Sequence, residues 1–346
     1  MLNALKKELV LRKDGSDVIK TIYFGGGTPS ILSVEEVQML INSVYENYEV
    51  VEGAEITLEA NPDDLSIEKI KELAKSPINR LSIGIQSFFE DDLKFMNRAH
   101  SCEESKKCLK EATKYFDNIT IDLIYGVPNM TNEKWLANLK MAFDFGVPHI
   151  SSYALTVEEK TALANFIKKG KVPPVDENLA LEHFNILVEE TERQGFIQYE
   201  ISNFGKPNYF SKHNMSYWLG EKYIGIGPSA HSFNGSERSW NISNNSKYLK
   251  VLDENKLASE TEILTTKDLF NEYIMTGLRT IWGISFQKVE KDFGIEILKT
   301  LKKNATPFIE NKLLELKEIS GSDITLITTK KGKFLADGIA SDLFIL

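Results

Sequence analysis

A run of three glycines is the first stretch of this chain whose composition could serve chemistry. Gly25, Gly26 and Gly27 follow the strand-like segment Thr21–Phe24 and precede Thr28. Because glycine has no Cβ atom, the backbone of such a turn can approach a ligand closely and adopt positive φ angles at little cost. Turns at the carboxyl ends of parallel strands are where α/β folds place small molecules. By itself the run fits either a ligand-binding turn or a tight connection between a strand and a helix.

Polar side chains at the ends of later apolar segments favour the ligand-binding interpretation. Glu59, Gln86 and Asp122 each lie on or at the end of a predicted strand. One polar residue at a strand end is ordinary, but three on successive parallel strands are typical of the rim of a ligand site. Carboxylates there can hold hydroxyl or ammonium groups of a ligand. Glu59 and Asp122 could instead be structural ion-pair partners of Arg80 or Arg98.

The segments that carry these residues alternate between strand and helix. Five strands are predicted in the first half, at residues 19–24, 54–59, 80–86, 118–124 and 148–155. Amphipathic helices are predicted around them, at residues 2–12, 34–48, 67–74, 103–116 and 133–145. This alternation predicts βα units with a parallel sheet or barrel. A proline-containing connector, a helix at 177–194 and a strand at 195–204 follow, and short helices with a small β wing occupy the region after residue 265.

Composition restricts the class of protein. The chain has 346 residues, a formal net charge of −9, 42% hydrophobic and 26% charged residues, which predicts a soluble protein of two or three domains. No apolar window of about 18 residues is present, so no integral membrane segment is expected. The N-terminus has neither the pattern of a secretory signal nor that of a transit peptide, so we expect a cytoplasmic protein. The acidic balance argues against nucleic-acid binding.

Two cysteines are present, and their spacing argues against a metal site or a disulfide. Cys102 and Cys108 are six residues apart in a polar helical stretch. Residues four apart share a helix face, whereas residues six apart do not. A disulfide is not expected in a reducing compartment. We therefore interpret both as incidental thiols.

Five motifs taken together resemble the HemW/HemN group of radical S-adenosylmethionine (SAM) proteins. They are Tyr23–Ser30, Glu59–Pro62, Ser82–Phe88, Asn97–His100 and Asp122–Pro128. The resemblance covers nearly the whole chain, and the order and spacing of the motifs are jointly specific. It implies an α/β fold: a partial (β/α)6 barrel that lacks its first strand, with a mainly helical C-terminal domain carrying a small β wing. It also implies three domains, which are the partial barrel at 1–175, a barrel extension with a HemW-like heme-binding region at 176–262, and the winged domain at 263–346.

The resemblance implies a SAM pocket at the strand ends. Its members would be Gly26, Gly27, Thr28, Glu59, Gln86, Arg98, Asp122 and Ala154. In the family, three cysteines spaced Cys-x3-Cys-x2-Cys ahead of the glycine turn hold a [4Fe-4S] cluster that chelates SAM. Here 24 residues precede Gly25 and none is cysteine. We therefore expect this chain as given to bind no cluster, to have no radical SAM activity and to bind SAM weakly or not at all. No residue is assigned a catalytic role.

The segment His213–Trp218 separates two branches of the group. It resembles the His-Asn-x-x-Tyr-Trp signature of the HemW branch, in which the histidine is associated with heme, and the oxidase branch differs here. A neutral imidazole can be an axial iron ligand, and Tyr217 and Trp218 could offer flat apolar surface to a porphyrin. His231 is a second candidate ligand. A histidine that caps a loop beside two core aromatic residues is the structural alternative.

The function implied by the resemblance is heme binding and delivery to acceptor apoproteins, respiratory ones included. No coproporphyrinogen oxidase activity is expected. The alternatives are an oxygen-independent coproporphyrinogen III oxidase-like radical enzyme and an inactive truncated remnant. Loss of one edge strand would expose an unpaired neighbour, which favours dimerisation.

Overall fold

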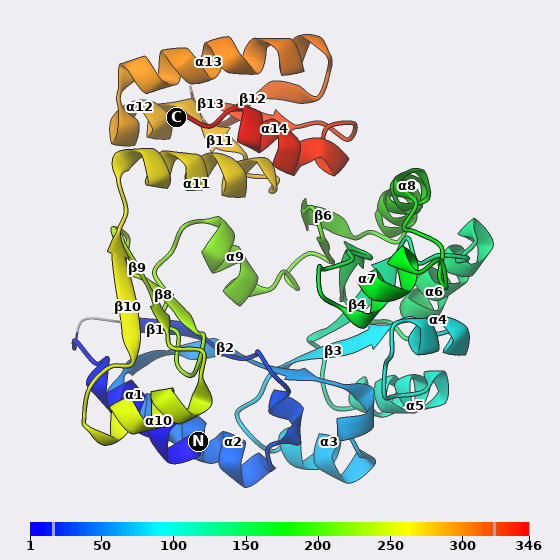
Figure 1. Ribbon diagram of the computed structural model, residues 1–346, viewed down its shortest axis with the longest axis vertical. Coiled ribbons are helices and arrows are strands. Elements are labelled where there is room, and N and C mark those ends of the chain that lie inside the picture. Colours follow the sequence, from blue (N-terminus) through cyan, green and yellow to red (C-terminus); the bar gives the residue numbers. More distant parts are fainter. Residues whose placement is uncertain (16–17, 321–322, 346) are drawn as a thin grey trace. The chain divides into compact units, whose positions relative to one another are not determined.

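The chain divides into two compact units, each of which is discontinuous in sequence. The computed structural model describes residues 1–15, 18–320 and 323–345 (Figure 1). Unit 1 consists of Met1–Lys20, Glu36–Ala54 and Ser211–Leu346, and unit 2 consists of Thr21–Glu35 and Glu55–Phe210. The two units interleave along the chain, and the division into residues 1–175, 176–262 and 263–346 stays a prediction.

A seven-stranded, curled half-barrel sheet carries the predicted site residues of unit 2. Its strand order is β1-β2-β3-β4-β5-β7-β6. The strands are β1 (Val18–Phe24), β2 (Glu49–Ala60), β3 (Arg80–Gln86), β4 (Ile119–Tyr125), β5 (His149–Ala154), β6 (Ile197–Glu200) and β7 (Asn203–Gly205). Strands β2 to β5 are parallel, and β7 is antiparallel to both of its neighbours. The predicted α/β fold with a parallel sheet is thus confirmed.

Short helices connect the strands of unit 2. They are η1 (Pro29–Ile31), η2 (Pro62–Asp64), α3 (Ile67–Leu73), α4 (Glu90–Phe95), α5 (Cys102–Ala112), α6 (Asn132–Asp144), α7 (Ala162–Lys168) and α8 (Glu177–Arg193). Helix α5 begins at a capping box, in which Ser101 and Glu104 satisfy each other's backbone N–H groups. Six of the seven residues of β3 are buried. Burial on both faces is the pattern of a parallel strand covered on either side.

The first part of unit 1 contains a small antiparallel sheet of order β10-β9-β8. Its elements are α1 (Leu2–Leu11), most of α2 (Val34–Asn47), α9 (Lys212–Trp218), β8 (His231–Phe233), β9 (Glu237–Asn241), α10 (Asn245–Asp253) and β10 (Ser259–Ile263). Trp240 in β9 lies directly opposite His231 on one side and Glu260 on the other. Directly paired residues project from the same sheet face, so these three side chains form one row.

The C-terminal part of unit 1 has its own hydrophobic core. It contains α11 (Thr266–Leu278), β11 (Ile284–Ser285), α12 (Phe286–Phe293), α13 (Ile295–Glu310), β12 (Leu314–Ser320), β13 (Asp323–Thr328), η3 (Lys333–Leu335) and α14 (Ala336–Asp342). The strands form a sheet of order β11-β13-β12, and the helices bury Phe270, Ile274 and Leu301 against it. The predicted helical domain with a β wing is confirmed. Among the residues that the structure describes, no helix combines the length and apolarity needed to cross a bilayer.

Most predicted elements agree with the structure to within a few residues, but some differ, and α4, α7 and α10 were not predicted. Strand β2 begins at Glu49 rather than at residue 54. The predicted strand 195–204 is two short strands, because the chain reverses between Glu200 and Asn203 to pair β6 with β7. Residues 212–218, for which no element was predicted, form α9, which starts where the Ser211 side chain accepts a hydrogen bond from the Asn214 N–H.

Candidate functional site

The first candidate site is a group of polar residues at the strand ends of unit 2, here called the carboxylate rim: Tyr23, Gly26, Glu59, Gln86 and Asp122. The Tyr23 hydroxyl donates to Glu59 Oε1 over 2.6 Å, and the Gly26 N–H donates to Glu59 Oε2 over 3.3 Å. Glu59 thereby joins the end of β2 to the glycine turn after β1. Sequence reasoning missed Tyr23, although its position at the end of an apolar strand beside the glycines was an available signal.

Close packing explains one of the three glycines and backbone conformation explains the other two. A Cβ atom at position 25 would lie 2.5 Å from the Tyr23 ring and 3.2 Å from the Glu59 carboxyl carbon. Gly26 and Gly27 have φ angles of 73° and 64°, a region that other residues rarely adopt. Apart from the glycine itself and its two chain neighbours, no described residue has an atom within 4 Å of where either Cβ atom would be. The turn is therefore tight on the side of Glu59 and open on the other.

Burial and neighbouring charges shift the pKa values of Asp122 and Tyr23 in the rim. Burial and the charge of Glu59 raise the pKa of Asp122 to about 7, while a hydrogen bond with Ser151 and the charge of Arg98 oppose the shift. Burial, together with the same carboxyl groups, raises the phenol pKa of Tyr23. Desolvation and the charge of Asp122 raise that of Tyr153, although the Tyr153 residue as a whole is 44% exposed. Both phenols therefore stay protonated and can donate hydrogen bonds. Tyr153 is a second rim neighbour that sequence reasoning missed.

The structure brings some of the remaining predicted pocket residues to the rim. Gln86 ends β3 with φ of 64°, and it is 7% exposed. Arg98 lies near enough for its charge to lower the pKa of Asp122. Thr28 follows Gly27 in the same turn and precedes η1. Ala154 ends β5 and lies opposite Tyr125 in the strand register.

The ion-pair alternative for the two carboxylates does not agree with the contacts. Arg80 is buried and donates to Asn118 Oδ1 and to the Thr120 hydroxyl. Within the described ranges, neither Glu59 nor Asp122 forms an ion pair with Arg80 or Arg98. The two carboxyl groups of the rim are therefore not ion-paired with these arginines. They can bind a positively charged group of a ligand.

The second candidate site lies in unit 1 and is here called the aromatic row: His213, Tyr217, Tyr223 and Phe233. Successive ring centroids are 5.0, 4.6 and 6.1 Å apart. The row begins on α9, passes through Tyr223, which pairs with Phe233 in an isolated bridge, and ends on β8. Successive ring planes are inclined by 87°, 69° and 38°, so the first two pairs meet edge to face. Such pairs stabilise each other without forming a flat surface.

His213 is neutral in this environment. Burial lowers the pKa of its imidazole to about 4. Its Nε2 lies 3.1 Å from the Tyr217 hydroxyl. Neutral imidazole is the form that binds metal ions, but an iron atom at Nε2 would first have to displace the phenol. Tyr217 is 40% exposed, so it has room to move.

Trp218 is not part of the aromatic row. The Arg279 guanidinium lies 5.2 Å from the centroid of its ring, and Arg279 in turn pairs with Asp337. The Trp218 Nε1 is buried and has no hydrogen-bond partner among the described residues. Of the predicted aromatic pair, the structure therefore places Tyr217 beside His213 and turns Trp218 toward α11.

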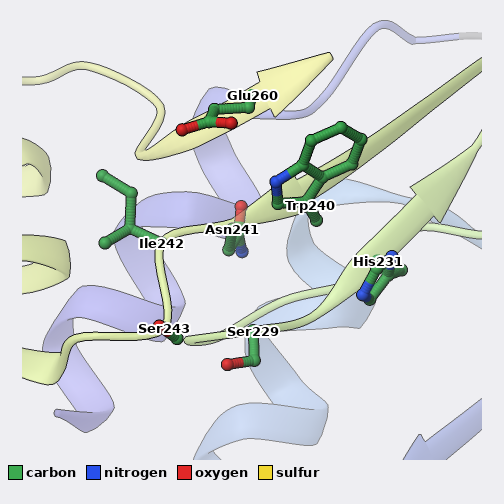
Figure 2. Close-up of a pocket in the computed structure, with 7 residues that line it drawn as sticks. All are labelled: Ser229, His231, Trp240, Asn241, Ile242, Ser243 and Glu260. Atoms are coloured by element: carbon green, nitrogen blue, oxygen red, sulfur yellow. The ribbon is translucent and has the colours of Figure 1, made fainter. Parts of the chain in front are cut away.

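His231 lies at a pocket of about 300 Å³ (Figure 2). The residues that line it are Ser229, His231, Trp240, Asn241, Ile242, Ser243 and Glu260. The His231 and Trp240 rings are 6.4 Å apart. Sequence reasoning missed Trp240 and Glu260, because only the strand register of β8, β9 and β10 places them beside His231.

Comparison with known proteins assigns the chain to a family. Residues 3–156 match the Radical SAM superfamily, and residues 264–319 match the HemN C-terminal domain. The heme chaperone HemW of Bacillus subtilis is 33% identical over 343 residues, which are 98% of this chain and 89% of that protein. The chain belongs to the HemW family of radical SAM proteins. HemW of Lactococcus lactis is 36% identical over 301 residues, 86% of this chain and 78% of the relative.

A solved structure shows that the fold is shared with a known enzyme. Coproporphyrinogen III oxidase (HemN) of Escherichia coli superimposes with a TM-score of 0.82 at 22% identity, covering 99% of this chain and 82% of that one. At this identity the likeness concerns the fold alone. The resemblance stated from the motifs is thereby confirmed at the level of family and fold.

The two groups that the radical SAM family implies differ in how well they fit these residues. SAM carries ribose hydroxyls and an ammonium group, and the rim offers carboxylates, phenols and the Gly26 N–H, so the donor set fits. A [4Fe-4S] cluster needs thiolates. The sequence has two cysteines, both in α5, and burial raises the pKa of the Cys108 thiol to about 12. In the part of the chain that the structure describes, no group of three or more His, Cys, Asp or Glu side chains is placed to hold a metal ion.

Proposed function

We propose that this HemW-family chain binds heme and delivers it to acceptor apoproteins, respiratory ones included. The observation that carries the proposal is the neutral imidazole of His213 at one end of the aromatic row. The name of its relatives, heme chaperone, supports the same function. An imidazole ligand for the iron and apolar contacts for the macrocycle are the two features that a porphyrin site requires.

Delivery requires that the heme be held reversibly, and the geometry at His213 supports this. The Tyr217 hydroxyl competes with iron for Nε2, so the heme-free state is stabilised by a hydrogen bond worth roughly 1 kcal/mol. The ring surface of Tyr217 is partly exposed, so a porphyrin could leave without local unfolding.

A hemin titration followed by absorption tests heme binding. The parent should show a saturable Soret shift, and His213→Ala should weaken binding about tenfold or more by removing an iron ligand. Ser216→Ala is the matched control, because Ser216 is on the same helix and its hydroxyl donates to the Lys212 carbonyl of that helix. Transfer from the loaded protein to apomyoglobin then measures delivery. Absence of a saturable shift in the parent would overturn the proposal.

We infer that the carboxylate rim is the SAM pocket of this family member, with Gly26, Gly27, Thr28, Glu59, Gln86, Arg98, Asp122 and Ala154 as its residues. The paired carboxylates and the open side of the glycine turn support this. Affinity should be weak because these residues bring no cluster to chelate SAM. Saturation-transfer NMR with SAM should give a signal that Glu59→Gln reduces and the exposed control Glu103→Gln does not. An equal signal in all three proteins would contradict the assignment.

We also infer that these 346 residues do not assemble a [4Fe-4S] cluster and have no radical SAM activity. Two cysteines on one helix cannot supply three thiolates. Iron and sulfide should be measured after anaerobic reconstitution and desalting. Stoichiometric iron and sulfide with a cluster absorption band would refute this inference, while leaving the heme proposal intact.

A further inference from the structure

We propose that the pocket at Trp240 and Glu260 binds a guanidinium or ammonium group, carried either by a free small molecule or by a basic side chain of another protein. The inference goes beyond the proposed heme binding and does not rest on it. The pocket lies in unit 1, and the residues that line it belong neither to the carboxylate rim nor to the aromatic row.

The charge of the lining favours a cation over an anion or a metal ion. Of the seven described residues that line the pocket, one is acidic and none is lysine or arginine. The exposed Glu260 carboxylate forms no hydrogen bond or ion pair with another described residue, so it would repel an anion. A metal ion needs several ligands, and among the described residues no group of three or more His, Cys, Asp or Glu side chains is placed to hold one.

The Trp240 indole gives the pocket an aromatic face next to this carboxylate. Antiparallel pairing places Glu260, Trp240 and His231 in one row across β10, β9 and β8, as Figure 2 shows. A cation that pairs with Glu260 therefore lies near the indole. Tryptophan attracts a cation more strongly than the other aromatic residues do, and a planar guanidinium can also stack on its ring.

The remaining polar groups of the lining can accept the hydrogen bonds that such a cation donates. Ser229 precedes β8 and Ser243 follows β9, and both line the pocket with His231. None of these three side chains forms a hydrogen bond with another described residue. A hydroxyl oxygen offers two acceptor lone pairs and a neutral imidazole offers one, whereas a guanidinium group has five N–H donors. The pocket can therefore satisfy several of these donors at once.

The adjacent row of the same sheet face already holds a guanidinium group between a ring and a carboxylate. It contains Arg238 and Phe233, because residues two apart in a strand project to the same side. The Arg238 guanidinium lies 5.9 Å from the centroid of the Phe233 ring and 2.6 Å from the Glu272 carboxylate. At the pocket the ring is Trp240 and the carboxylate is Glu260, but the chain supplies no cation. The proposed ligand would supply it.

The wall of the pocket is held in place by a buried polar network, which argues for a preformed site. The Asn241 amide donates to Glu8 Oε1 and to the Gly227 carbonyl, both over 2.7 Å, and Arg12 donates to Asn241 Oδ1 over 2.7 Å. Glu8 is fully buried and also accepts from the Gly227 N–H. Ser229 has a φ of 61°, a strained value for a residue other than glycine. A rigid wall reduces the ordering cost of binding.

The edge of β10 offers a way for a second protein to present the cation. Among the described strands β10 pairs with β9 alone, and its residues Glu260–Ile263 are exposed. An exposed edge strand can pair with an extended segment of another chain. A lysine or arginine directly opposite Glu260 on the added strand would project to the face that carries Trp240 and would form a favourable cross-strand charge pair.

Titration of the full chain with N-acetylarginine amide, followed by saturation-transfer NMR, tests the pocket. N-acetylcitrulline amide is the matched ligand, because it has nearly the same shape and no charge. The arginine probe should give a saturable signal, and the citrulline probe should bind at least about threefold more weakly. Glu260→Gln and Trp240→Leu should each weaken arginine binding about two- to fivefold. Glu262→Gln is the matched control, because it removes a charge from the same face of β10 outside the pocket lining.

A short peptide with arginine between valine and threonine residues distinguishes the two sources of the cation. Binding about tenfold tighter than that of N-acetylarginine amide, lost when the peptide backbone is N-methylated, would assign the site to a protein partner. Equal affinity of the two probes would assign it to a free small cation.

Equal binding of the arginine and citrulline probes would overturn the proposal, as would equal effects of Glu260→Gln and Glu262→Gln. Circular dichroism of each variant checks that the fold is retained. Hemin binding at His213 is measured separately, so failure of this site and failure of the proposed function are distinguishable.

Discussion

The carboxylate rim of unit 2 contains acidic groups whose negative charges repel one another. The aromatic row of unit 1, by contrast, contains an imidazole in its neutral form. In the rim, burial and Glu59 raise the pKa of Asp122 to about 7. In the row, burial lowers the pKa of His213 to about 4. Burial disfavours the charged form in both cases, so it raises the pKa of an acid and lowers that of a base. The rim therefore suits a ligand that carries a positive charge, whereas the row keeps His213 in the neutral form that can donate to a metal ion.

The two regions also differ in how their residues are assembled. Rim residues come from the ends of successive parallel strands, so the order of the strands along the chain already brings them together. The row and the His231 pocket depend on a short helix, an isolated bridge and the register of three antiparallel strands. Their supporting contacts reach back to α1 through Glu8. If the two regions are independent, a mutation in one should leave ligand binding in the other unchanged.

The largest effect is expected from Glu8→Ala, which should destabilise unit 1. Glu8 is fully buried and accepts from Arg12, Asn241, Tyr248 and the Gly227 N–H. Its removal leaves the largely buried Arg12 guanidinium without its carboxylate, and the Tyr248 hydroxyl and the Gly227 N–H without this acceptor. This should lower the free energy of unfolding by about 3–5 kcal/mol. Urea denaturation followed by circular dichroism measures the loss.

The same variant distinguishes the regions through ligand binding. SAM-dependent NMR signals from the rim should stay as in the parent, because the Glu8 contacts with Gly227, Asn241 and Tyr248 lie in unit 1. A loss of less than about 1 kcal/mol would show that the Glu8 network adds little to stability.

Asp122→Asn should stabilise the protein, and the gain should depend on pH. The folded-state pKa of about 7 lies above the ordinary value of an aspartate. Ionisation of Asp122 therefore opposes folding, and the penalty grows as pH rises from about 4 to 7 and is constant above. A shift of about three units at about 1.4 kcal/mol each means that the variant should be more stable than the parent by up to about 4 kcal/mol at pH 8 and nearly equal to it at pH 4. Thermal unfolding at several pH values measures the difference, and a pH-independent gap would show that Asp122 does not titrate in this way.

Tyr217→Phe should bind hemin more tightly than the parent does. Phenylalanine keeps the ring of the aromatic row and removes the hydroxyl that lies 3.1 Å from His213 Nε2. A lost hydrogen bond of about 1 kcal/mol corresponds to roughly fivefold tighter binding at His213. An absorption titration of Tyr217→Phe in the His231→Ala background measures hemin binding at His213 without the second candidate ligand. Weaker binding there would mean that the hydroxyl assists the heme site rather than competing for Nε2.

The smallest effects are expected at the ion pair of Arg238 with Glu272. Arg238→Gln should weaken hemin binding about two- to fivefold by removing a partner for propionate, an effect of roughly 0.5–1 kcal/mol. The matched variant Glu272→Gln should strengthen binding by a similar factor, because it releases Arg238. Titrations at low and high salt measure both. Effects of the same sign in the two variants would argue against a propionate at this position.

Much of the fold and of the rim could be predicted before the structure was seen. The strand predicted at 80–86 coincides with β3, and the helices predicted at 67–74 and 133–145 overlap α3 and α6 closely. These elements have strong periodic patterns and lie between turn residues. The rim followed from them because parallel strands place their carboxyl ends together. Tyr23 and Tyr153 were missed, since a tyrosine at a strand end has no pattern that separates it from a core residue.

The aromatic row was predicted only in part. His213 and Tyr217 are four residues apart, and a helix places them on one face. Trp218 was expected with them, but a helix turns the next residue away by about 100°, and it packs under Arg279. Tyr223 and Phe233 join the row through pairing that no local pattern signals.

Local periodicity in the amino-acid sequence determined the alternation of strands and helices in the first half, the tight glycine turn and the polar strand ends, because each depends on residues a few positions apart. Tertiary structure alone decided that Glu8 is buried beneath the Gly227 loop, that Glu260 and Trp240 stand beside His231, and that Asp122 shares its surroundings with Glu59. Burial, strand register and the field of neighbouring charges arise only when distant segments meet, and they set the chemistry of both regions.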